Sequence, residues 1–394
     1  MRLLRPTLCA LGILAACQTP PPPKPISLDD YSAELAPGEP GLSRVSLTET
    51  PDFSAGWFQR DRLQESIRES LSYLASPSSK KFFPFGPVSH PKMVASLERF
   101  SELLESSESS EEFGKSVSDE FEVWMARGRK NSGEVLFTGY CRPILKGARQ
   151  PDSRFRFPLY RLPEDLVKGK DGSIQGRRTA GGKVVPYYSR SELNKGSHLK
   201  GLEFVWLDDA YDAYIAHVQG SALIQLPDGE FIEAGYAGKN GHEYQSVGQA
   251  LIAEGSLKKS QLSLSGLRKY FRDNPAEVDR ALSINPSYVF FQPSEGGPFG
   301  CLGRKVTPMR SLATDKDVFP RASLVFCEVR LPDFDSKGEL IQRPQRFFAL
   351  DQDRGGAIRS AGRCDVFMGT GPEALKRSGH TMAVGRMYYL FLRS

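Results

Sequence analysis

The segment "FFALDQDRGGAIRSAGRCDVFMGTG", from Phe347 to Gly371, carries two aspartates on either side of a glycine-containing turn. Small and apolar residues surround Asp353 and Asp365, and the run has no helical period. The pattern therefore predicts two short strands joined by a turn. Aspartate often caps turns, which is the structural explanation for both acids. The alternative is that both aspartates belong to a functional site, which requires other residues of the chain to supply the remaining groups of that site.

The whole chain has 394 residues, and its sequence indicates an α+β protein that is mainly β. The 37 glycines and 28 prolines favour many turns and short strands. Residues 55–129 carry apolar residues three or four apart, as at Leu63, Ile67 and Leu71, which predicts helices. Strands are expected from Val135, including three or four within residues 202–238. Helices are expected again within residues 246–286, and strands to the end, so the order predicts two β domains.

The N-terminal sequence "MRLLRPTLCALGILAAC" has the basic start and short apolar run of an export signal. Its end resembles the lipobox of bacterial lipoproteins, in which Cys17 would carry the lipid. The alternative is an ordinary secretory signal. Residues 1–17 are then the signal peptide and residues 18–26 a proline-rich tether. The lipobox resemblance, with Gln18 after the cysteine, implies a lipid-anchored protein at the periplasmic face of the outer membrane.

Several chemistries are excluded by the residues that are missing. The net charge of +5 is small and spread out, which argues against a nucleic-acid partner. No nucleophile elbow, phosphate loop or dinucleotide fingerprint is present. The histidines and cysteines have no metal-ligand spacing, so neither a metal nor another cofactor is expected. Four cysteines follow Cys17, and their three pairings remain open: Cys141, Cys301, Cys327 and Cys364.

The remaining candidates are carboxylates, amides and hydroxyls in glycine-containing turns. They occur in "FTGY" (Phe137 to Tyr140), "VQGS" (Val218 to Ser221) and "YAGKNGHEYQSVG" (Tyr236 to Gly248). Such groups suit carbohydrate chemistry, because an acid can protonate a glycosidic oxygen while amides and hydroxyls bind sugar hydroxyls.

The chain at this point resembles the membrane-bound lytic murein transglycosylase A family, which is glycoside hydrolase family 102. The likeness runs from about Val135 to Leu392 and includes "FTGY", "FPLYRLP", "VQGSALIQLPDG", "GYAGKNGHEYQSVGQALIAEG", "NPSYVFFQP" and "DRGGAIRSAGRCDVFMGTGPEA". It implies a double-psi β-barrel with a second β domain inserted, and a groove between them for peptidoglycan glycan strands. Residues 27–142, with the N-terminal helices, and residues 292–394 would form the barrel, and residues 143–291 the inserted, substrate-binding domain.

The resemblance also implies residue roles. The family's C-terminal module is named for three aspartates, which correspond to Asp315, Asp353 and Asp365. Asp365 would be the catalytic acid, with Asp353 and Asp315 shaping and polarising the site. The substrate's own C6 hydroxyl would act as nucleophile, giving 1,6-anhydromuramyl ends without water. Sugar contacts are carried over to Tyr140, Gln219, Gly220, Ser221, Lys239, Asn240, Gly241, His242 and Asp315.

Alternatives remain open for several of these residues. His242 is as well explained as a hydrogen-bonded structural histidine, and Lys239 as a solvated loop lysine. Cys141 and Cys364 adjoin proposed groove residues, so both thiols are expected behind the groove, as a disulfide or as free thiols.

The sequence departs from the family pattern at Cys141, Arg142, Ala222 and Met368. Two rival functions stay open. One is a hydrolase on the same barrel, with Asp353 as base, since double-psi barrels also serve endoglucanases. The other is a non-catalytic peptidoglycan-binding lipoprotein, which these departures make possible. Candidate protein partners are those of cell-wall synthesis or division.

Overall fold

The computed structural model describes residues 28–36, 38–169 and 173–393. Cys17, the signal peptide and the tether of residues 18–26 lie outside the described residues. Within the described ranges, no helix has the length and apolar character needed to cross a membrane.

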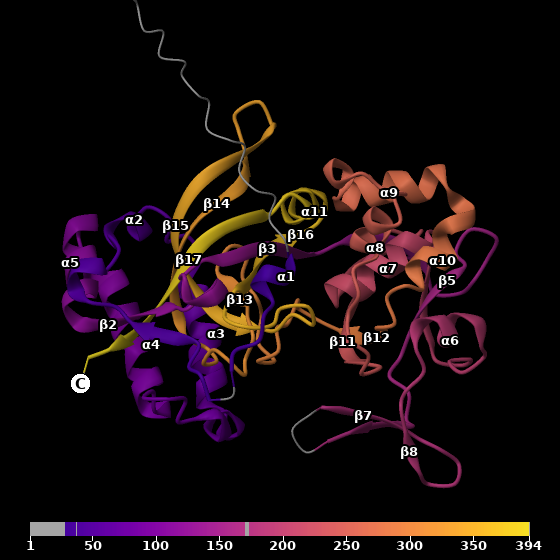
Figure 1. Ribbon diagram of the computed structural model, residues 1–394, viewed down its shortest axis with the longest axis horizontal. Coiled ribbons are helices and arrows are strands. Elements are labelled where there is room, and N and C mark those ends of the chain that lie inside the picture. The colour runs from indigo at the N-terminus through magenta and orange to yellow at the C-terminus, as the bar shows by residue number, and fades with distance from the viewer. Residues whose placement is uncertain (1–27, 37, 170–172, 394) are drawn as a thin grey trace, which may run out of the picture.

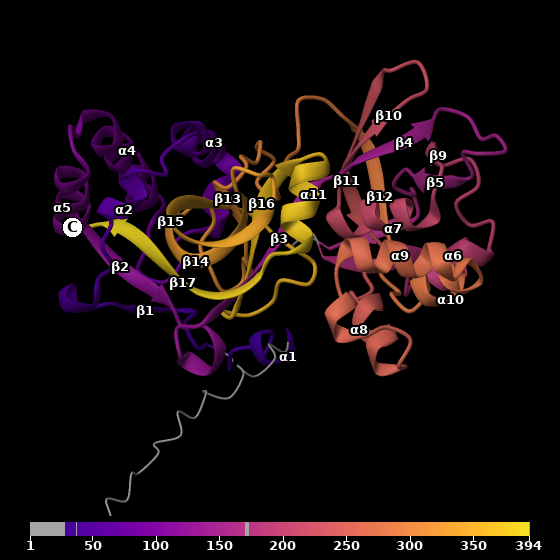
Figure 2. The same cartoon turned by 90° about the horizontal axis from the view of Figure 1, so that it is seen from above.

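Six strands close into a barrel of mixed parallel and antiparallel pairs (Figures 1 and 2). Each strand pairs with the next, and the additional pairing of β17 with β3 closes the ring. The β15–β13 and β16–β3 pairs are parallel, whereas the others are antiparallel. Around the ring the strands are β17 (Met382–Leu392), β14 (Leu324–Phe334), β15 (Leu340–Asp353), β13 (Ser311–Ala313), β16 (Arg363–Thr370) and β3 (Val135–Arg142).

N-terminal helices cover one side of this barrel (Figure 1). They are α2 (Ser54–Trp57), α3 (Leu63–Ala75), α4 (His90–Ser106) and α5 (Ser110–Glu120), preceded by α1 (Leu28–Tyr31). Buried Phe100 and Phe113 pack against Phe348 of β15 in tilted and edge-to-face contacts, at 4.8 and 5.8 Å between ring centroids. Burial of such aromatic faces is worth roughly 1.5–3 kcal/mol per side chain. The apolar period read from residues 55–129 therefore marks the faces that pack on the barrel.

The helical prediction is wrong for the last part of that region. Residues Phe121–Ala126 form strand β2, which pairs with β17 and with β1 (Leu42–Arg44). Phe121, Val123 and Ala126 are buried while Glu122 and Trp124 are only partly so. Pairing with the barrel strand β17 overrides the local helical pattern at this point.

The second domain is a six-stranded sheet with its own core, inserted between β3 and β13. Its order is β12-β11-β10-β4-β9-β5. The strands are β4 (Ile144–Ala148), β5 (Phe157–Tyr160), β9 (Glu203–Leu207), β10 (Ala222–Gln225), β11 (Phe231–Lys239) and β12 (Val289–Ser294). The predicted start at residue 143 falls directly before β4, and the predicted end at residue 291 falls inside β12. The fold class, a mainly β α+β protein with a barrel and a second β domain, is confirmed.

Helices and a small sheet complete the inserted domain. The helices are α6 (Arg190–Lys195), α7 (Ala210–Gln219), α8 (Val247–Ala253), α9 (Leu264–Asp273) and α10 (Val278–Leu282). The small sheet is β6 (Leu166–Lys168), β7 (Ile174–Arg178) and β8 (Val184–Val185), which projects from the domain in Figure 1. One further helix, α11 (Pro372–Gly379), packs on barrel strands β3 and β16.

Residues 202–238 hold three strands, β9, β10 and β11, as predicted, but helix α7 lies between β9 and β10 and was not predicted. The Asp209 side chain caps its N-terminus by accepting a hydrogen bond from the Asp212 N–H. Gly220 ends the helix in the left-handed region, at φ +75°. The predicted hairpin turn at Asp228-Gly229 does lie between strands β10 and β11. Capping residues, rather than periodicity, were the signal for this helix.

All four described cysteines are free. Cys141 and Cys364 are both buried in the barrel core, as expected from their places beside Tyr140 and Asp365. In the parallel β3–β16 pair, Cys364 lies level with Phe137, four residues before Cys141. At ~3.3 Å per residue their Cα atoms are ~13 Å apart, so the disulfide alternative is excluded and the free thiols are confirmed.

Candidate active site

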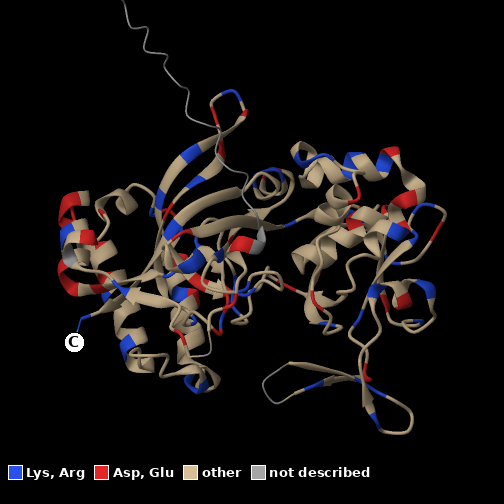
Figure 3. Ribbon diagram, viewed as in Figure 1, with Lys and Arg blue, Asp and Glu red and all other residues tan. Residues whose placement is uncertain are grey.

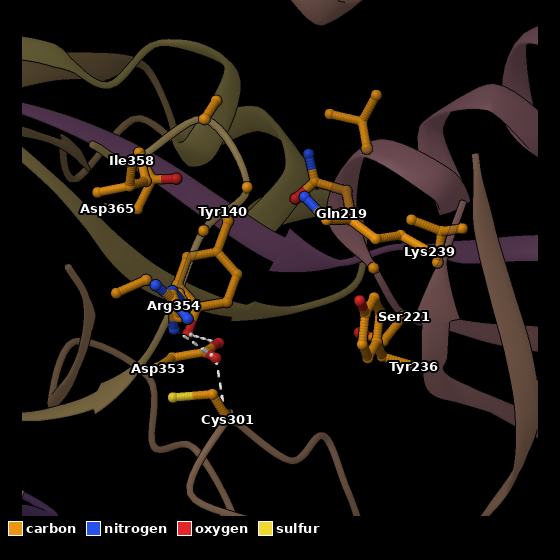
Figure 4. Close-up of a pocket in the computed structure, with 18 of the residues that line it drawn as sticks. Tyr140, Gln219, Ser221, Tyr236, Lys239, Cys301, Asp353, Arg354, Ile358 and Asp365 are labelled. Atoms are coloured by element: carbon orange, nitrogen blue, oxygen red, sulfur yellow. Dashed lines mark hydrogen bonds between the residues drawn. The ribbon is translucent and has the colours of Figure 1, made fainter. Parts of the chain in front are cut away.

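A long groove of about 1740 Å³ separates the barrel from the inserted domain. Residues of both domains line it, and Figure 4 shows Asp353, Asp365 and Tyr140 on one side facing Gln219, Ser221 and Lys239 on the other. This volume exceeds the ~300–1,000 Å³ of an ordinary small-molecule pocket. A groove of this size fits an extended, oligomeric ligand.

The sheet register brings Asp353 and Asp365 onto the same groove. Ala313 of β13 lies level with Asp365 of β16 and also with Asp353 of β15. Two strand spacings of ~4.8 Å then put the two aspartate Cα atoms ~10 Å apart. The small Ala313 side chain is between them, and it also lines the groove.

An irregularity in the β15–β13 pair makes this alignment possible. Leu312 is level with Asp351, but the next residue, Ala313, is level with Asp353, so β15 has one extra residue here. Such bulges redirect side chains and often lie beside active sites. Asp351 is fully buried, paired with Lys316 and bonded to the Tyr389 hydroxyl, whereas Asp353 reaches the groove.

Asp365 has few hydrogen-bond donors around it. The Thr138 hydroxyl donates to its Oδ1, and Thr138 lies level with Asp365 on the adjacent strand β3. Burial raises the pKa of Asp365, while the Arg363 charge and the Thr138 hydrogen bond oppose the rise. No described residue donates a hydrogen bond to Oδ2 of Asp365. This oxygen can therefore hold a proton.

Asp353 is held by three donors. Its Oδ1 accepts the backbone N–H groups of Cys301 and Arg354, each at 2.8 Å, and its Oδ2 accepts the Tyr140 hydroxyl at 2.8 Å. Burial raises the pKa of Asp353, and all three hydrogen bonds oppose that rise. Burial and the Asp353 charge raise the pKa of Tyr140 well above its usual value, so the phenol remains a donor. Donors on both oxygens favour the ionised carboxylate.

The inserted domain contributes polar groups from the end of α7 and the end of β11. The Gln219 Oε1 accepts the backbone N–H of Cys141 at 2.8 Å, which ties α7 to the end of barrel strand β3. Gly220, Ser221, Lys239 and Gly241 also line the groove. The backbone φ of +86° at Gly241 favours glycine, and an added Cβ would also lie 3.0 Å from the Ile174 side chain.

Three of the predicted substrate contacts are not among the groove-lining residues. Asn240 is 2% exposed, and its side chain bonds the backbone of Tyr188, Pro286 and Tyr288. The His242 ring bonds the Tyr187 carbonyl, which fits the structural alternative. Asp315, 6% exposed, accepts hydrogen bonds from the backbone N–H groups of Asp317 and Ser360.

Sequence reasoning missed other groove residues. Thr138 belongs to the "FTGY" motif and is two residues before Tyr140, so period-2 alternation could have placed it on the same face. Tyr236 and Phe299 present exposed rings to the groove, 51% and 45% exposed. Aromatic side chains with a few polar groups among them are a common lining of ligand-binding grooves. No sequence pattern marked Ala313 as a groove residue, because only the register of the sheet brings it between the two aspartates.

The two chain crossings between the domains are tied together by Glu233 of β11. Its Oε2 is 3.1 Å from Nη1 of Arg142, at the end of β3, and accepts the Gly297 N–H at 3.0 Å, after β12. Arg142 also donates to the Thr370 hydroxyl at 3.2 Å. Arg142, one of the departures from the family pattern, thus joins the barrel to the inserted domain.

No group of three or more His, Cys, Asp or Glu residues in the described parts of the chain could hold a metal ion. Two partly buried carboxylates with unlike hydrogen bonding, on a groove lined by exposed aromatic rings and amides, are typical of glycan-cleaving enzymes. The fold and site therefore define this class.

Comparison with known proteins makes the assignment specific. Residues 136–292 match the family model "MltA specific insert domain" and residues 310–391 match the "3D domain". The chain is 32% identical over 271 residues to membrane-bound lytic murein transglycosylase A of Vibrio cholerae, covering 68% of each chain. It is 31% identical over 272 residues to the same protein of Escherichia coli K12, covering 68% of this chain and 69% of that one.

Solved structures agree with these matches. A membrane-bound lytic murein transglycosylase from Agrobacterium tumefaciens superposes with a TM-score of 0.73 at 26% identity, covering 90% of this chain and 98% of that one. E. coli MltA with bound chitohexaose gives a TM-score of 0.70 at 25% identity, covering 94% and 98%. The chain belongs to the membrane-bound lytic murein transglycosylase A family.

Proposed function

We propose that this protein cleaves the MurNAc-β-1,4-GlcNAc bond of peptidoglycan and leaves 1,6-anhydromuramyl ends. Family membership supports the reaction, and the groove of about 1740 Å³ supports a polymeric substrate. The roles of the two acids are assigned from the unequal number of hydrogen bonds that the protein donates to them. Asp353 receives three hydrogen bonds, whereas Asp365 receives one.

In the first step, protonated Asp365 donates its proton to the glycosidic oxygen, and the bond between that oxygen and C1 of MurNAc breaks. The GlcNAc unit leaves with a hydroxyl group. Positive charge develops on the sugar ring, and the ionised Asp353 on the same groove stabilises it electrostatically. The raised pKa of Asp365 keeps it protonated at a pH where an ordinary aspartate has lost its proton.

In the second step, the C6 hydroxyl of the same MurNAc attacks C1, and the Asp365 carboxylate takes the proton that this hydroxyl releases. A bond between O6 and C1 forms, Asp365 is protonated again, and no water is consumed. A tethered nucleophile has a high effective concentration, so a second carboxylate acting as nucleophile or base is not required. One acid then serves both proton transfers.

The test of this assignment is Asp365→Asn. The amide keeps the side-chain shape but cannot carry the proton, so turnover of sacculi should fall by ~10²–10⁴. Binding of glycan to the variant should persist. Asp353→Asn should reduce turnover less, because it changes the field at Asp365 rather than removing the proton carrier. Turnover by Asp365→Asn close to that of the wild type would remove this residue from the mechanism.

For localisation, we propose a lipid on Cys17 that anchors the protein at the periplasmic face of the outer membrane. The relatives are named membrane-bound, and the N-terminal sequence resembles a lipobox. Incorporation of labelled fatty acid should depend on Cys17. A Cys17→Ser protein that is still cut before residue 17 and stays with the membrane would contradict the anchor. Proteins of cell-wall synthesis or division are the candidate partners.

A further inference from the structure

The groove contains an excess of positive charge that the proton-transfer chemistry does not use. Ten Lys and Arg residues line it, against five Asp and Glu residues. The whole chain is nearly balanced, with 52 basic and 47 acidic residues. Acidic residues gather instead on α5, on the far side of the barrel from the inserted domain (Figure 3). An uncharged sugar polymer does not require this excess.

Two of these ten cations make no hydrogen bond, ion pair or ring contact within the described part of the chain. The other eight each make a hydrogen bond, an ion pair or a ring contact, as Arg354 does with Asp317 at 2.6 Å and Arg142 with Glu233 at 3.1 Å. The side chains of Lys239 and Arg359 contact no hydrogen-bond acceptor, acid or ring among the described residues. Partly buried cations are normally paired, so these two side chains are suited to binding an anion.

These two residues reach the groove from opposite domains. Lys239 is the last residue of β11, in the inserted domain, and Figure 4 shows it across the groove from Arg354. Arg359 belongs to the loop between Asp353 and Asp365. Asp315 holds that loop by accepting the Ser360 N–H at 3.0 Å, and the Ile358 side chain beside Arg359 is 1% exposed. Arg359 is therefore attached to a fixed part of the loop.

The electrostatics agree with the geometry. Burial lowers the pKa of Lys239, and the Arg359 charge lowers it further. Arg354 adds to this effect, and Glu243 opposes it without forming an ion pair with Lys239. Two like charges that repel each other, neither of them in an ion pair with a described acid, would both be stabilised by a bound anion.

We propose that Lys239 and Arg359 form a subsite for a carboxylate of the substrate, which would bridge the two domains. The identity of the ligand rests on the proposed function. Peptidoglycan has two sources of carboxylates: the lactyl group of muramic acid when the peptide has been removed, and the stem peptide when it is present. Binding between the domains would place the muramyl residue beside the loop that joins the two acids. In this account Asp315 is a positioning residue for Arg359.

The test measures ligand binding to the inactive Asp365→Asn protein with and without Lys239→Met or Arg359→Gln. Three ligands separate the sources: peptide-bearing glycan strands, amidase-stripped strands with free lactyl carboxylates, and chitohexaose, which has no carboxylate. Lys337→Met, an exposed lysine in the turn between β14 and β15, is the control for loss of one charge.

Each groove variant should weaken binding of a carboxylate-bearing ligand ~10-fold and leave chitohexaose within about twofold. Weaker binding of the stripped strands would identify the lactyl carboxylate as the group that is bound. Weaker binding of the peptide-bearing strands alone would identify a carboxylate of the stem peptide. Equal weakening of all three ligands, or no weakening of any, overturns the subsite. The products of the wild-type enzyme test the reaction independently of the subsite. Hydrolytic products together with this binding pattern would overturn the proposed reaction and leave the carboxylate subsite standing.

Discussion

At the scale of single residues, hydrogen-bond donors make two similar aspartates different. Both Asp353 and Asp365 are partly buried on one groove, and burial raises the pKa of each. Asp353 also receives two backbone N–H groups and the Tyr140 hydroxyl, which favour its ionised form. Environments that separate the pKa values of two carboxyl groups are a general way to assign an acid and a charged stabiliser.

This difference predicts a bell-shaped dependence of kcat/KM on pH. Activity needs Asp353 ionised, so it should fall as pH drops through the pKa of Asp353. It also needs Asp365 protonated, so it should fall as pH rises through the raised pKa of Asp365. The two acids share one groove and can influence each other's ionisation. The apparent pKa values read from the two limbs of the profile therefore describe the pair of acids rather than each residue alone.

Tyr140→Phe should narrow this profile. The hydrogen bond from Tyr140 lowers the pKa of Asp353, so its loss should raise that pKa and move the acid limb to higher pH. The alkaline limb should stay in place, and the maximal rate should fall ~10-fold or less. Tyr73→Phe is the control, since the Tyr73 hydroxyl is buried without a hydrogen-bond partner in the described structure. Equal movement of both limbs would contradict the assignment.

At the scale of secondary-structure elements, the short strand β13 sets the spacing of the site. Ala313 lies level with both acids, and its side chain is small. Ala313→Leu should fill the space between the carboxylates and reduce turnover by at least ~10²-fold, in line with the effect of misplacing a substrate by about 1 Å. Its Tm should fall modestly, because Ala313 is 2% exposed and overpacking a buried position costs ~1–3 kcal/mol.

Ala313→Ser is the matched control, since it changes the volume little and should keep most of the activity. Near-normal turnover by Ala313→Leu would show that the substrate does not pass between the two acids. A large fall in Tm, measured by thermal unfolding, would mean that the added side chain disrupts the sheet instead.

The sequence predicted the strands on both sides of the opening segment and the two acids they carry. It did not predict how the acids meet, because that depends on β13 lying between them and on the extra residue in β15. Helix α7 was missed because its signals are a capping aspartate and a terminal glycine within an aromatic run that also suits strands. The cysteine pair could not be settled without the register of β3 and β16.

Family resemblance had its own limits at the residue level. It grouped Asn240 and His242 with the sugar contacts, although both side chains are engaged by the protein's own backbone. A motif preserves residues that shape a loop as well as residues that contact a ligand, and the two kinds cannot be separated without the hydrogen bonds. Gly241 in the same motif does line the groove.

At the scale of the whole molecule, the groove depends on how the two domains are joined. Glu233 contacts both chain crossings, through Arg142 and the Gly297 N–H. Glu233→Ala removes both contacts, so the domains should vary more in their relative position. Chitohexaose binding should weaken ~3- to 10-fold, and kcat and KM should change together, as for hinge residues.

Glu230→Ala provides the comparison. Its ion pair with Arg149 at 3.0 Å is exposed and lies within the inserted domain, so its loss should leave binding unchanged. Small-angle scattering of the free proteins should show a broader distribution of shapes for Glu233→Ala alone. Identical scattering and binding for the two variants would contradict the role of Glu233 in holding the groove.

The most direct test of the central claim is the isotope content of the products formed in H₂¹⁸O. If the C6 hydroxyl of the substrate is the nucleophile and Asp365 carries both protons, soluble muropeptides should end in 1,6-anhydromuramyl groups without ¹⁸O. Mass spectrometry should find them one water lighter than hydrolysis products. Reducing MurNAc ends that carry ¹⁸O as the main product would show that water is the nucleophile, and would contradict the transglycosylase mechanism.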